Sequence, residues 1–200
     1  MDHAKIVEAD SLDTLQAVVE ENPDADLLLL DLNMPGVTGF SALAYIRNNH
    51  ESLPTVIVSA SDDPAVIRRS IQHGASGFIP KSSPIATLEK GIRAVLDGEV
   101  WIPEGINLDD DQLDSEEAKI TAALGSLTPH QFRVLMMLGE GLLNKQIAFQ
   151  LGVSEATIKA HVTAILRKMH VNNRTQAVLA VQQLHINGPG FVDSGRDATA

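Results

Sequence analysis

The sequence predicts an α/β domain with a parallel sheet, followed by a smaller all-α domain that contains a helix-turn-helix. Short apolar runs alternate with helical patterns over residues 1–99, whereas residues 127–187 show only helical patterns. The charge also changes from negative to positive between these two parts. We therefore expect domains at 1–99 and 127–187, separated by an acidic linker at 100–126 and followed by a flexible tail at 188–200.

In the first part, apolar runs predict the strands, and caps and prolines predict the helices. The expected strands are a weak one at Ala4–Ala9 and better ones at Leu27–Leu30, Thr55–Val58 and Gly77–Ile79. The expected helices lie between Ser11 and Pro23, between Asp63 and Gly74, and between Ser83 and Gly98. Helices of roughly ten residues between short strands are typical of a repeated βα unit.

Three polar residues follow the expected strands at the end where they leave the sheet. Asp31 closes the leucine run, Ser59 closes "TVIVS" and Lys81 follows "GFIP". Loops beyond the carboxyl ends of parallel strands share one crevice, so we expect these side chains to converge. A carboxylate acceptor, a hydroxyl donor and an ammonium group are suited to holding a phosphoryl group on Asp31.

The second part reads as four helices. Thr128 with Pro129 opens the first, which runs to about Gly139, and Asn144 opens the next. Gly152 and Val153 form the turn to a third helix capped by Ser154, and the fourth helix spans Arg174 to Leu184. The short second and third helices, joined by a tight turn that contains glycine, indicate a helix-turn-helix.

The third helix separates an apolar face from a polar one. Its apolar stripe consists of Ile158, Val162, Ile165 and Met169. Thr157, Lys159, Ala160, Thr163 and Arg167 lie off this stripe, where a recognition helix presents side chains to DNA. The sequence therefore predicts double-stranded DNA as a partner.

Composition excludes several other classes of protein. The formal net charge of the chain is −11, yet residues 127–187 contain six Lys or Arg against two acidic residues. No cysteine is present, so disulfides and thiol chemistry are excluded. No apolar run is long enough to span a membrane and no secretory signal is recognisable, so we expect a cytoplasmic protein without a membrane partner.

The segments "LLLLDLNMPGVTGF", "VIVSASDD" and "GASGFIPKS" resemble the receiver domain of two-component response regulators. This resemblance implies a flavodoxin-like fold with strand order 2-1-3-4-5. It further implies that a sensor histidine kinase phosphorylates Asp31, and that Phe78 is the aromatic switch residue. Mg²⁺ would be bound by Asp31 and by the backbone carbonyl of Asn33.

The chain departs from the receiver pattern at its start, because it begins at what resembles the family's second strand. We therefore expect a receiver truncated at its N-terminus, without the first strand, the first helix and the acidic pair that helps to bind Mg²⁺. Such a site would have few oxygen ligands for the ion. Unpaired strand edges also favour contact with another chain, so a homodimer with swapped elements is a further expectation.

The second part resembles the LuxR-type DNA-binding domain through "LTP", "GLLNKQIA", "LGVSEATIKAHV", "ILRKM" and "NNRTQAV". Together the two parts resemble response regulators of the NarL/FixJ class. By this resemblance the base-reading positions are Lys159, Ala160 and Thr163, and the phosphate contacts are Lys145, Lys168 and Arg174. The last helix would form the dimer contact through Ala177, Val178 and Val181. Arg133 departs from the family, which usually has an acidic residue there.

The expected function is that of a transcription regulator controlled by phosphorylation of Asp31, and not that of an enzyme. One alternative keeps DNA binding but makes the truncated receiver a phosphorylation-independent module for dimerisation or partner binding. An aspartyl-nucleophile phosphatase is less favoured, because such enzymes need a second acid two residues after the nucleophile. Asn33 occupies that position.

Overall fold

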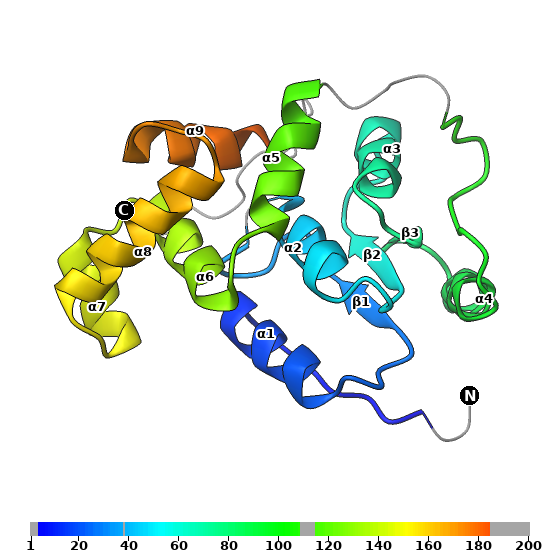
Figure 1. The fold of residues 1–200 in the computed structure, drawn as a ribbon. Helices are drawn as coiled ribbons and strands as arrows, with labels where there is room; N and C mark the ends of the chain where they lie inside the picture. The colour runs from blue at the N-terminus through cyan, green and yellow to red at the C-terminus, as the bar shows by residue number, and fades with distance from the viewer. Residues whose placement is uncertain (1–3, 38, 109–114, 185–200) are drawn as a thin grey trace, which may run out of the picture.

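A three-stranded parallel sheet forms the centre of the N-terminal domain (Figure 1). The structure is a computed structural model that describes residues 4–37, 39–108 and 115–184. The strands are β1 (Leu28–Leu30), β2 (Thr55–Ser59) and β3 (Gly77–Pro80), in the spatial order β1-β2-β3. All three lie where the sequence predicted strands. The weak strand expected at 4–9 is wrong: this segment leads into the first helix and no strand is assigned to it.

Four helices accompany the sheet: α1 (Leu12–Glu21), α2 (Ser41–Asn49), α3 (Pro64–Gln72) and α4 (Ile85–Leu96). Alternate strand residues face different helices, as the two-residue period of a strand requires. Ile57 and Phe78 belong to the core beneath α1, α2 and α3. Val56 and Ile79 face Val95 of α4 on the other side of the sheet. The result is the expected α/β layer arrangement.

The C-terminal helices confirm the sequence prediction closely. They are α6 (Pro129–Gly139), α7 (Asn144–Leu151), α8 (Glu155–Lys168) and α9 (Arg174–Gln183). Thr128 caps α6, and Ser154 caps α8 by accepting a hydrogen bond from Thr157 N at 3.1 Å. Gly152 ends α7 with a φ of 65°, a backbone conformation that favours glycine. This tight turn sets α7 and α8 as a helix-turn-helix.

Helix α5 (Ser115–Gly125) corrects the prediction of an acidic linker over residues 100–126. Ile120 and Leu124 are four residues apart, lie on one face of the helix and are buried. The helix packs along α2, as Figure 1 shows. Because the segment is rich in acidic residues, the sequence did not reveal this short apolar face. The predicted tail at 188–200 lies outside the described residues.

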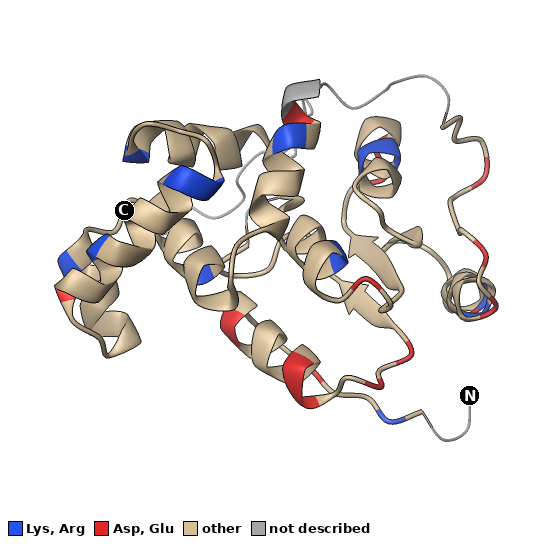
Figure 2. Ribbon diagram, in the orientation of Figure 1, with Lys and Arg blue, Asp and Glu red and all other residues tan. Residues whose placement is uncertain are grey.

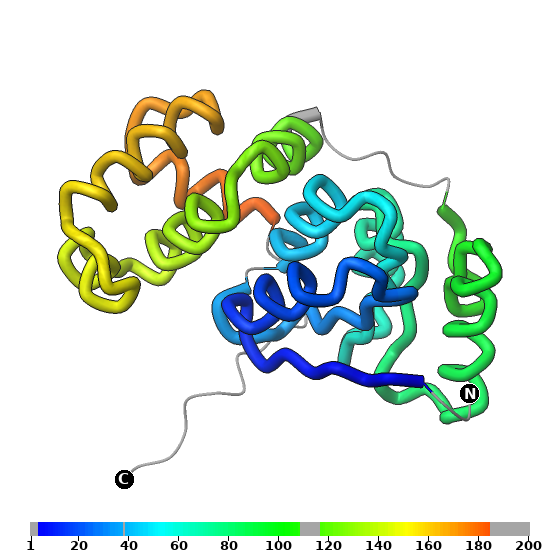
Figure 3. The backbone as a smooth tube through the Cα atoms, turned by 60° about the horizontal axis from the view of Figure 1, so that its bottom comes forward, coloured from blue at the N-terminus to red at the C-terminus, as the bar shows by residue number. Residues whose placement is uncertain are grey.

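One hydrophobic core extends from the receiver-like domain into the helical domain. The rings of Tyr45 on α2 and Phe132 on α6 stack with centroids 4.5 Å apart, and Ser41 Oγ donates to Met136 Sδ at 3.6 Å. The tube view in Figure 3 shows α5 and α6 beside the N-terminal domain, while α7 and α8 project away from it. In the described part of the chain, no helix is long and apolar enough to cross a membrane.

Candidate carboxylate site and nucleic-acid interface

Asp31 and Lys81 meet at the carboxyl end of the sheet. Lys81 Nζ donates to Asp31 Oδ2 at 2.6 Å, although the two residues are far apart in sequence. The other carboxylate oxygen, Oδ1, accepts the backbone N–H of Asn33 at 2.9 Å. Both side chains remain partly exposed to solvent. The carboxylate is therefore held by two donors on an open surface that a phosphodonor could approach.

Ser59 and Phe78 lie deeper, on β2 and β3. The Ser59 side chain is buried, and its hydroxyl oxygen accepts the N–H of Ser61 at 3.2 Å. The Phe78 ring is fully buried in the core, and its backbone N–H donates to Trp101 O at 2.9 Å. Lys81 N donates to Ser59 O at 2.7 Å, so the ends of β2 and β3 are fixed side by side. The structure thus brings the predicted Ser59 and Lys81 to the same end of the sheet.

The donor set around Asp31 does not fit Mg²⁺ in this arrangement. Mg²⁺ prefers six oxygen ligands in an octahedron, usually including more than one carboxylate or phosphate group. Asp31 and the Asn33 carbonyl are the two protein ligands that the sequence suggested, and Lys81 already contacts the carboxylate. Among the described residues, no group of three or more His, Cys, Asp or Glu side chains could hold a metal ion.

The predicted base-reading side chains lie on an exposed face of α8. The exposed predicted DNA contacts are Lys145, Thr157, Lys159, Ala160, Thr163 and Arg167. Lys159 Nζ forms an i,i+4 ion pair with Glu155 Oε1 at 3.1 Å, which salt and competing phosphates would readily replace. Figure 2 shows basic residues on α7 and α8, with the acidic Glu155 in the first turn of α8. Acidic residues lie on α1 and several loops of the N-terminal domain, whose helices α2, α3 and α4 also carry basic residues. This surface has the charge and shape for the major groove.

Two predicted phosphate contacts have structural partners instead. Lys168 Nζ donates to Ser126 O at 2.6 Å and to Gln131 Oε1 at 2.9 Å. Arg174 Nη2 donates to Leu142 O at 2.6 Å, just beyond the end of α6. Both side chains are half-buried. Their bonds stabilise the domain itself, so the prediction that they contact phosphate is not supported by this conformation.

The predicted dimer contact on α9 needs a correction. Ala177 and Val181 are buried in the core of their own domain, and Val178 is half-buried against it. The exposed side of this helix carries polar residues and one large apolar side chain, Leu179, which is 54% exposed. The resemblance implied that these residues meet a second copy, but Ala177 and Val181 pack inward against their own domain.

Arg133 has a role that its sequence position did not reveal. Its Nη2 donates to Asp13 Oδ2 of α1 at 2.6 Å, which joins the two domains. Asp13 is well exposed, so solvent weakens this ion pair. The two residues are 120 positions apart. No local pattern could have predicted their contact.

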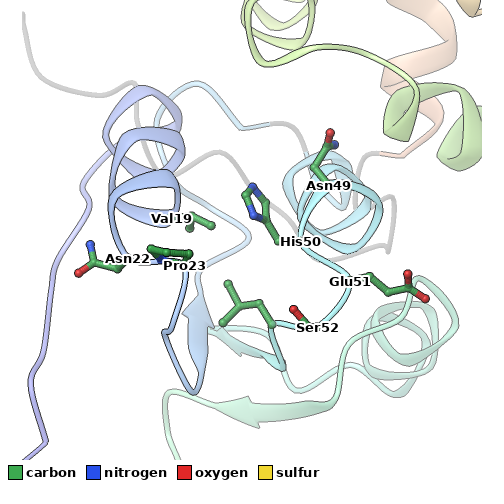
Figure 4. A pocket seen from close by; sticks show the side chains of 8 residues that line it. Val19, Asn22, Pro23, Asn49, His50, Glu51 and Ser52 are labelled. Carbon is green, nitrogen blue, oxygen red and sulfur yellow. The ribbon is translucent and has the colours of Figure 1, made fainter.

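A cavity of about 650 Å³, shown in Figure 4, lies beside the segments that lead into β1 and β2, whereas Asp31 follows the carboxyl end of β1. It is bounded by the end of α1 and by the loop that precedes β2, including Asn22, His50 and Glu51. Asn22 Nδ2 already donates to Val18 O, as expected for a polar residue that ends a helix. Among the described residues that line this cavity there is no Lys or Arg to offset the charge of a phosphoryl group.

Comparison with known proteins identifies a matching family for each of the two parts of the chain. Residues 1–93 match the response regulator receiver domain, and residues 125–181 match the bacterial regulatory proteins of the luxR family. The first match begins at residue 1, so the prediction of a receiver without its first strand and helix is not supported.

Relatives with similar sequences extend across both domains. The glycerol metabolism activator of Pseudomonas putida is 41% identical over 182 residues, covering 88% of this chain and 82% of its own length. The nitrate/nitrite response regulator NarL of Escherichia coli K12 is 32% identical over 167 residues, covering 83% and 77% of the two chains. A structure of the Salmonella typhimurium RcsB response regulator is 23% identical with a TM-score of 0.47, covering 85% and 81%.

Proposed function

The chain belongs to the two-component response regulators that join a receiver domain to a LuxR-type DNA-binding domain, and from this premise we propose that phosphorylation of Asp31 controls its binding to DNA. Regulation of transcription through DNA is the function of this family, and partnership with a histidine kinase is typical of it. The proposal assigns the phosphoacceptor role to Asp31, with Lys81 and Ser59 as its neighbours.

The observation that carries this proposal is the contact between Lys81 Nζ and Asp31 Oδ2. A carboxylate oxygen of Asp31 would attack the phosphorus of a phosphohistidine, forming a P–O bond as the P–N bond breaks. The electron pair of the broken bond stays on the imidazole nitrogen, which takes up a proton from water and leaves as neutral imidazole. The Lys81 ammonium would offset the negative charge that the phosphoryl group brings. The Ser59 hydroxyl, at the neighbouring strand end, would donate to a phosphoryl oxygen.

We expect phosphorylation to control where the DNA-binding domain is placed, and not whether the receiver covers the face of α8 that contacts DNA. Lys159, Ala160 and Thr163 are exposed although the two domains are packed together. A receiver that blocked DNA sterically would bury these side chains. Phosphorylation would therefore act by changing how two reading domains are placed relative to each other, which favours DNA with paired half-sites.

Incubation with acetyl phosphate and Mg²⁺, followed by intact mass measurement, tests the phosphoacceptor. We expect a gain of one phosphoryl group in the native chain and in the control Asp26→Asn, whose exposed acid precedes β1. Asp31→Asn should show no gain. A phosphoryl group that persists on Asp31→Asn would refute the assignment. Repetition across a range of Mg²⁺ concentrations measures how far the poor donor set limits the reaction.

A second candidate is a phosphorylation-independent regulator whose receiver serves as a dimerisation or partner-binding module. The lack of a metal-binding group among the described residues favours it, because receivers in general use Mg²⁺ for phosphorylation. Under this alternative, neither the native chain nor the Asp31→Asn variant gains the mass of a phosphoryl group. DNA binding would then be identical with and without acetyl phosphate.

The proposed dimer uses the outward side of α9 around Leu179. An exposed leucine on the last helix offers an apolar contact to the same residue of a second copy, in a two-fold arrangement. Leu179→Asp should lower the fraction of dimer on DNA while leaving the fold unchanged. Analytical ultracentrifugation with a two-half-site duplex gives this fraction, and an unchanged dimer population would exclude this side of α9.

The relative from Pseudomonas putida is an activator of glycerol metabolism, and we extend activation of transcription to this chain as part of the proposal. Deletion of the gene should lower the transcripts of its target genes, and a chain with Asp31→Asn should not restore them. Transcripts that rise in the deletion strain would indicate repression.

A further inference from the structure

Four side chains of the N-terminal domain and of α5, the helix that leads into the DNA-binding domain, form a polar cluster that we call the Glu117 clamp: Arg69, His73, Glu117 and Thr121. Glu117 Oε1 accepts hydrogen bonds from Arg69 Nη2 at 2.5 Å and Arg69 Nε at 3.1 Å. The same oxygen lies 2.7 Å from His73 Nε2. His73 Nδ1 lies 3.2 Å from Thr121 Oγ1, one helical turn beyond Glu117.

The clamp is largely shielded from water. The side chains of His73, Glu117 and Arg69 are 0%, 15% and 23% exposed. Phe40 covers one side, because its ring stacks on His73 at 4.9 Å and lies under the Arg69 guanidinium at 5.0 Å. In such surroundings a carboxylate that loses its cationic partner is left poorly solvated, so the three groups hold one another in place.

The clamp also reaches the last helix of the DNA-binding domain. Arg69 Nη2 donates to Gln183 O at 3.3 Å, and Phe40 N donates to Leu184 O at 3.2 Å. Arg69 therefore fixes both the helix that enters the reading domain and the end of α9. A movement of α3 would shift both helices together.

The opposite end of α3 is connected to the carboxylate site by successive hydrogen bonds. Ser61 N donates to Ser59 Oγ at 3.2 Å, and Asp63 N donates to Ser61 Oγ at 3.2 Å. Asp63 Oδ1 then accepts Ala65 N at 2.8 Å and so caps α3. A hydroxyl drawn toward a phosphoryl group would release the first of these bonds and disturb the start of the helix.

We propose that α3 transmits the state of Asp31 to the DNA-binding domain through the Glu117 clamp, which locks the two domains in one arrangement. The role in transmission rests on the proposed function, whereas the locking role does not. Helix α3 is a nine-residue element of about 13 Å, short enough to move as a rigid rod. Its first turn responds to Ser59, and its last turn carries Arg69 and ends at His73.

The absence of cysteine permits a direct test by spin labelling. Ala86→Cys on α4 and Gln150→Cys on α7 place labels on exposed positions of the two domains. Pulsed electron resonance then measures the distance between them in the full-length chain. We compare the native clamp with Glu117→Gln, and with Glu89→Gln on the exposed side of α4 as a control for the same change of charge.

We expect one narrow distance distribution for the native clamp and for Glu89→Gln, and a distribution at least twofold broader for Glu117→Gln. Arg69→Lys, which keeps the charge but loses the planar fork, should also broaden it. Circular dichroism confirms that each variant is folded. A distribution for both clamp variants as narrow as that of the control would overturn the locking role.

Addition of acetyl phosphate separates transmission from phosphorylation. In chains that gain the phosphoryl mass, the native distance should shift, and this shift should be absent from Glu117→Gln. An equal shift in both, or no shift in a phosphorylated native chain, would overturn transmission through the clamp. If no chain gains mass, the proposed phosphorylation fails, and the broadening by Glu117→Gln still decides whether the clamp locks the domains.

Discussion

Replacement of Phe132 by alanine should destabilise both domains at once. Phe132 on α6 is fully buried and stacks on Tyr45 of the receiver, with ring centroids 4.5 Å apart and planes inclined by 22°. Removal of a buried phenylalanine ring costs about 3–5 kcal/mol of unfolding free energy. About 0.5–1.5 kcal/mol of this belongs to the stacked pair.

The single tryptophan makes this coupling measurable. Trp101 lies on the receiver side, where its backbone pairs with Gly77 of β3, so its fluorescence follows unfolding of the receiver. With a urea slope of about 2 kcal/mol per molar, Phe132→Ala should lower the midpoint by about 2 M. Because the core is shared, fluorescence and circular dichroism should report the same shift.

The matched control is Phe149→Ala on α7, whose ring is 88% exposed and whose loss should change the midpoint very little. Should Phe132→Ala prove too unstable to purify, Phe132→Leu keeps most of the apolar volume and should cost about 1 kcal/mol. A Trp101 transition that stays at the native midpoint while circular dichroism shifts would refute the shared core. The domains would then unfold independently.

Three further predictions concern DNA, pH and packing. Lys159→Ala should cost about 1–3 kcal/mol of binding free energy on a specific duplex and much less on random DNA, whereas Lys145→Ala should weaken binding to both alike. Titrations followed by fluorescence anisotropy measure these affinities. Equal losses on both kinds of DNA for Lys159→Ala would contradict its base-reading role. Burial lowers the pKa of His73 in the folded chain, so this histidine binds a proton more readily in the unfolded chain. The free energy of unfolding should therefore fall as the pH drops through about 6.5, the ordinary pKa of histidine. His73→Gln should remove this loss between pH 7 and 5 in urea titrations, and an unchanged pH profile would count against it. Gly91→Ala should cost about 1–3 kcal/mol, because the added Cβ would lie 2.8 Å from the Trp101 ring; an unaltered melting temperature would show that the ring can move aside.

The sequence predicted those parts of the fold that depend on neighbours along the chain. The Thr128 side chain accepts the backbone N–H of Gln131, and the Gln131 side chain accepts the backbone N–H of Thr128. The start of α6 is therefore fixed by residues within one turn of each other. Likewise the buried stripe of α8 follows a regular spacing, and Asp31 and Lys81 each follow a recognisable strand. Topology then brings these strand ends to one edge, which is why their contact could be anticipated.

Helix α2 shows what such local signals omit. Its N-cap residue is Phe40, without a side-chain capping bond, and its residues from Ser41 to Ile46 are all buried. A helix surrounded by other elements shows little separation of apolar and polar faces, so its period gives a weak signal. Its formation depends on α5 and on the sheet that cover it.

The charged contacts between the domains were equally hidden. Glu117 is separated from His73 by 44 residues and from Arg69 by 48, and it lies in a segment whose acidic composition suggested a solvated linker. Similarly, the resemblance implied a dimer contact through Ala177, Val178 and Val181, but the sequence could not tell that Ala177 and Val181 are buried within their own domain.

By itself, the sequence determined the two domains, most of their helices and strands, the convergence of Asp31 with Lys81 and the exposed polar face of α8. These features depend on hydrogen bonds and spacings within a few residues, or on strand ends that share one sheet edge. Only the tertiary structure decided the Glu117 clamp, the shared core and the inward face of α9. They arise where surfaces distant in sequence exclude water from one another, and which surfaces do so depends on the packing of the whole chain.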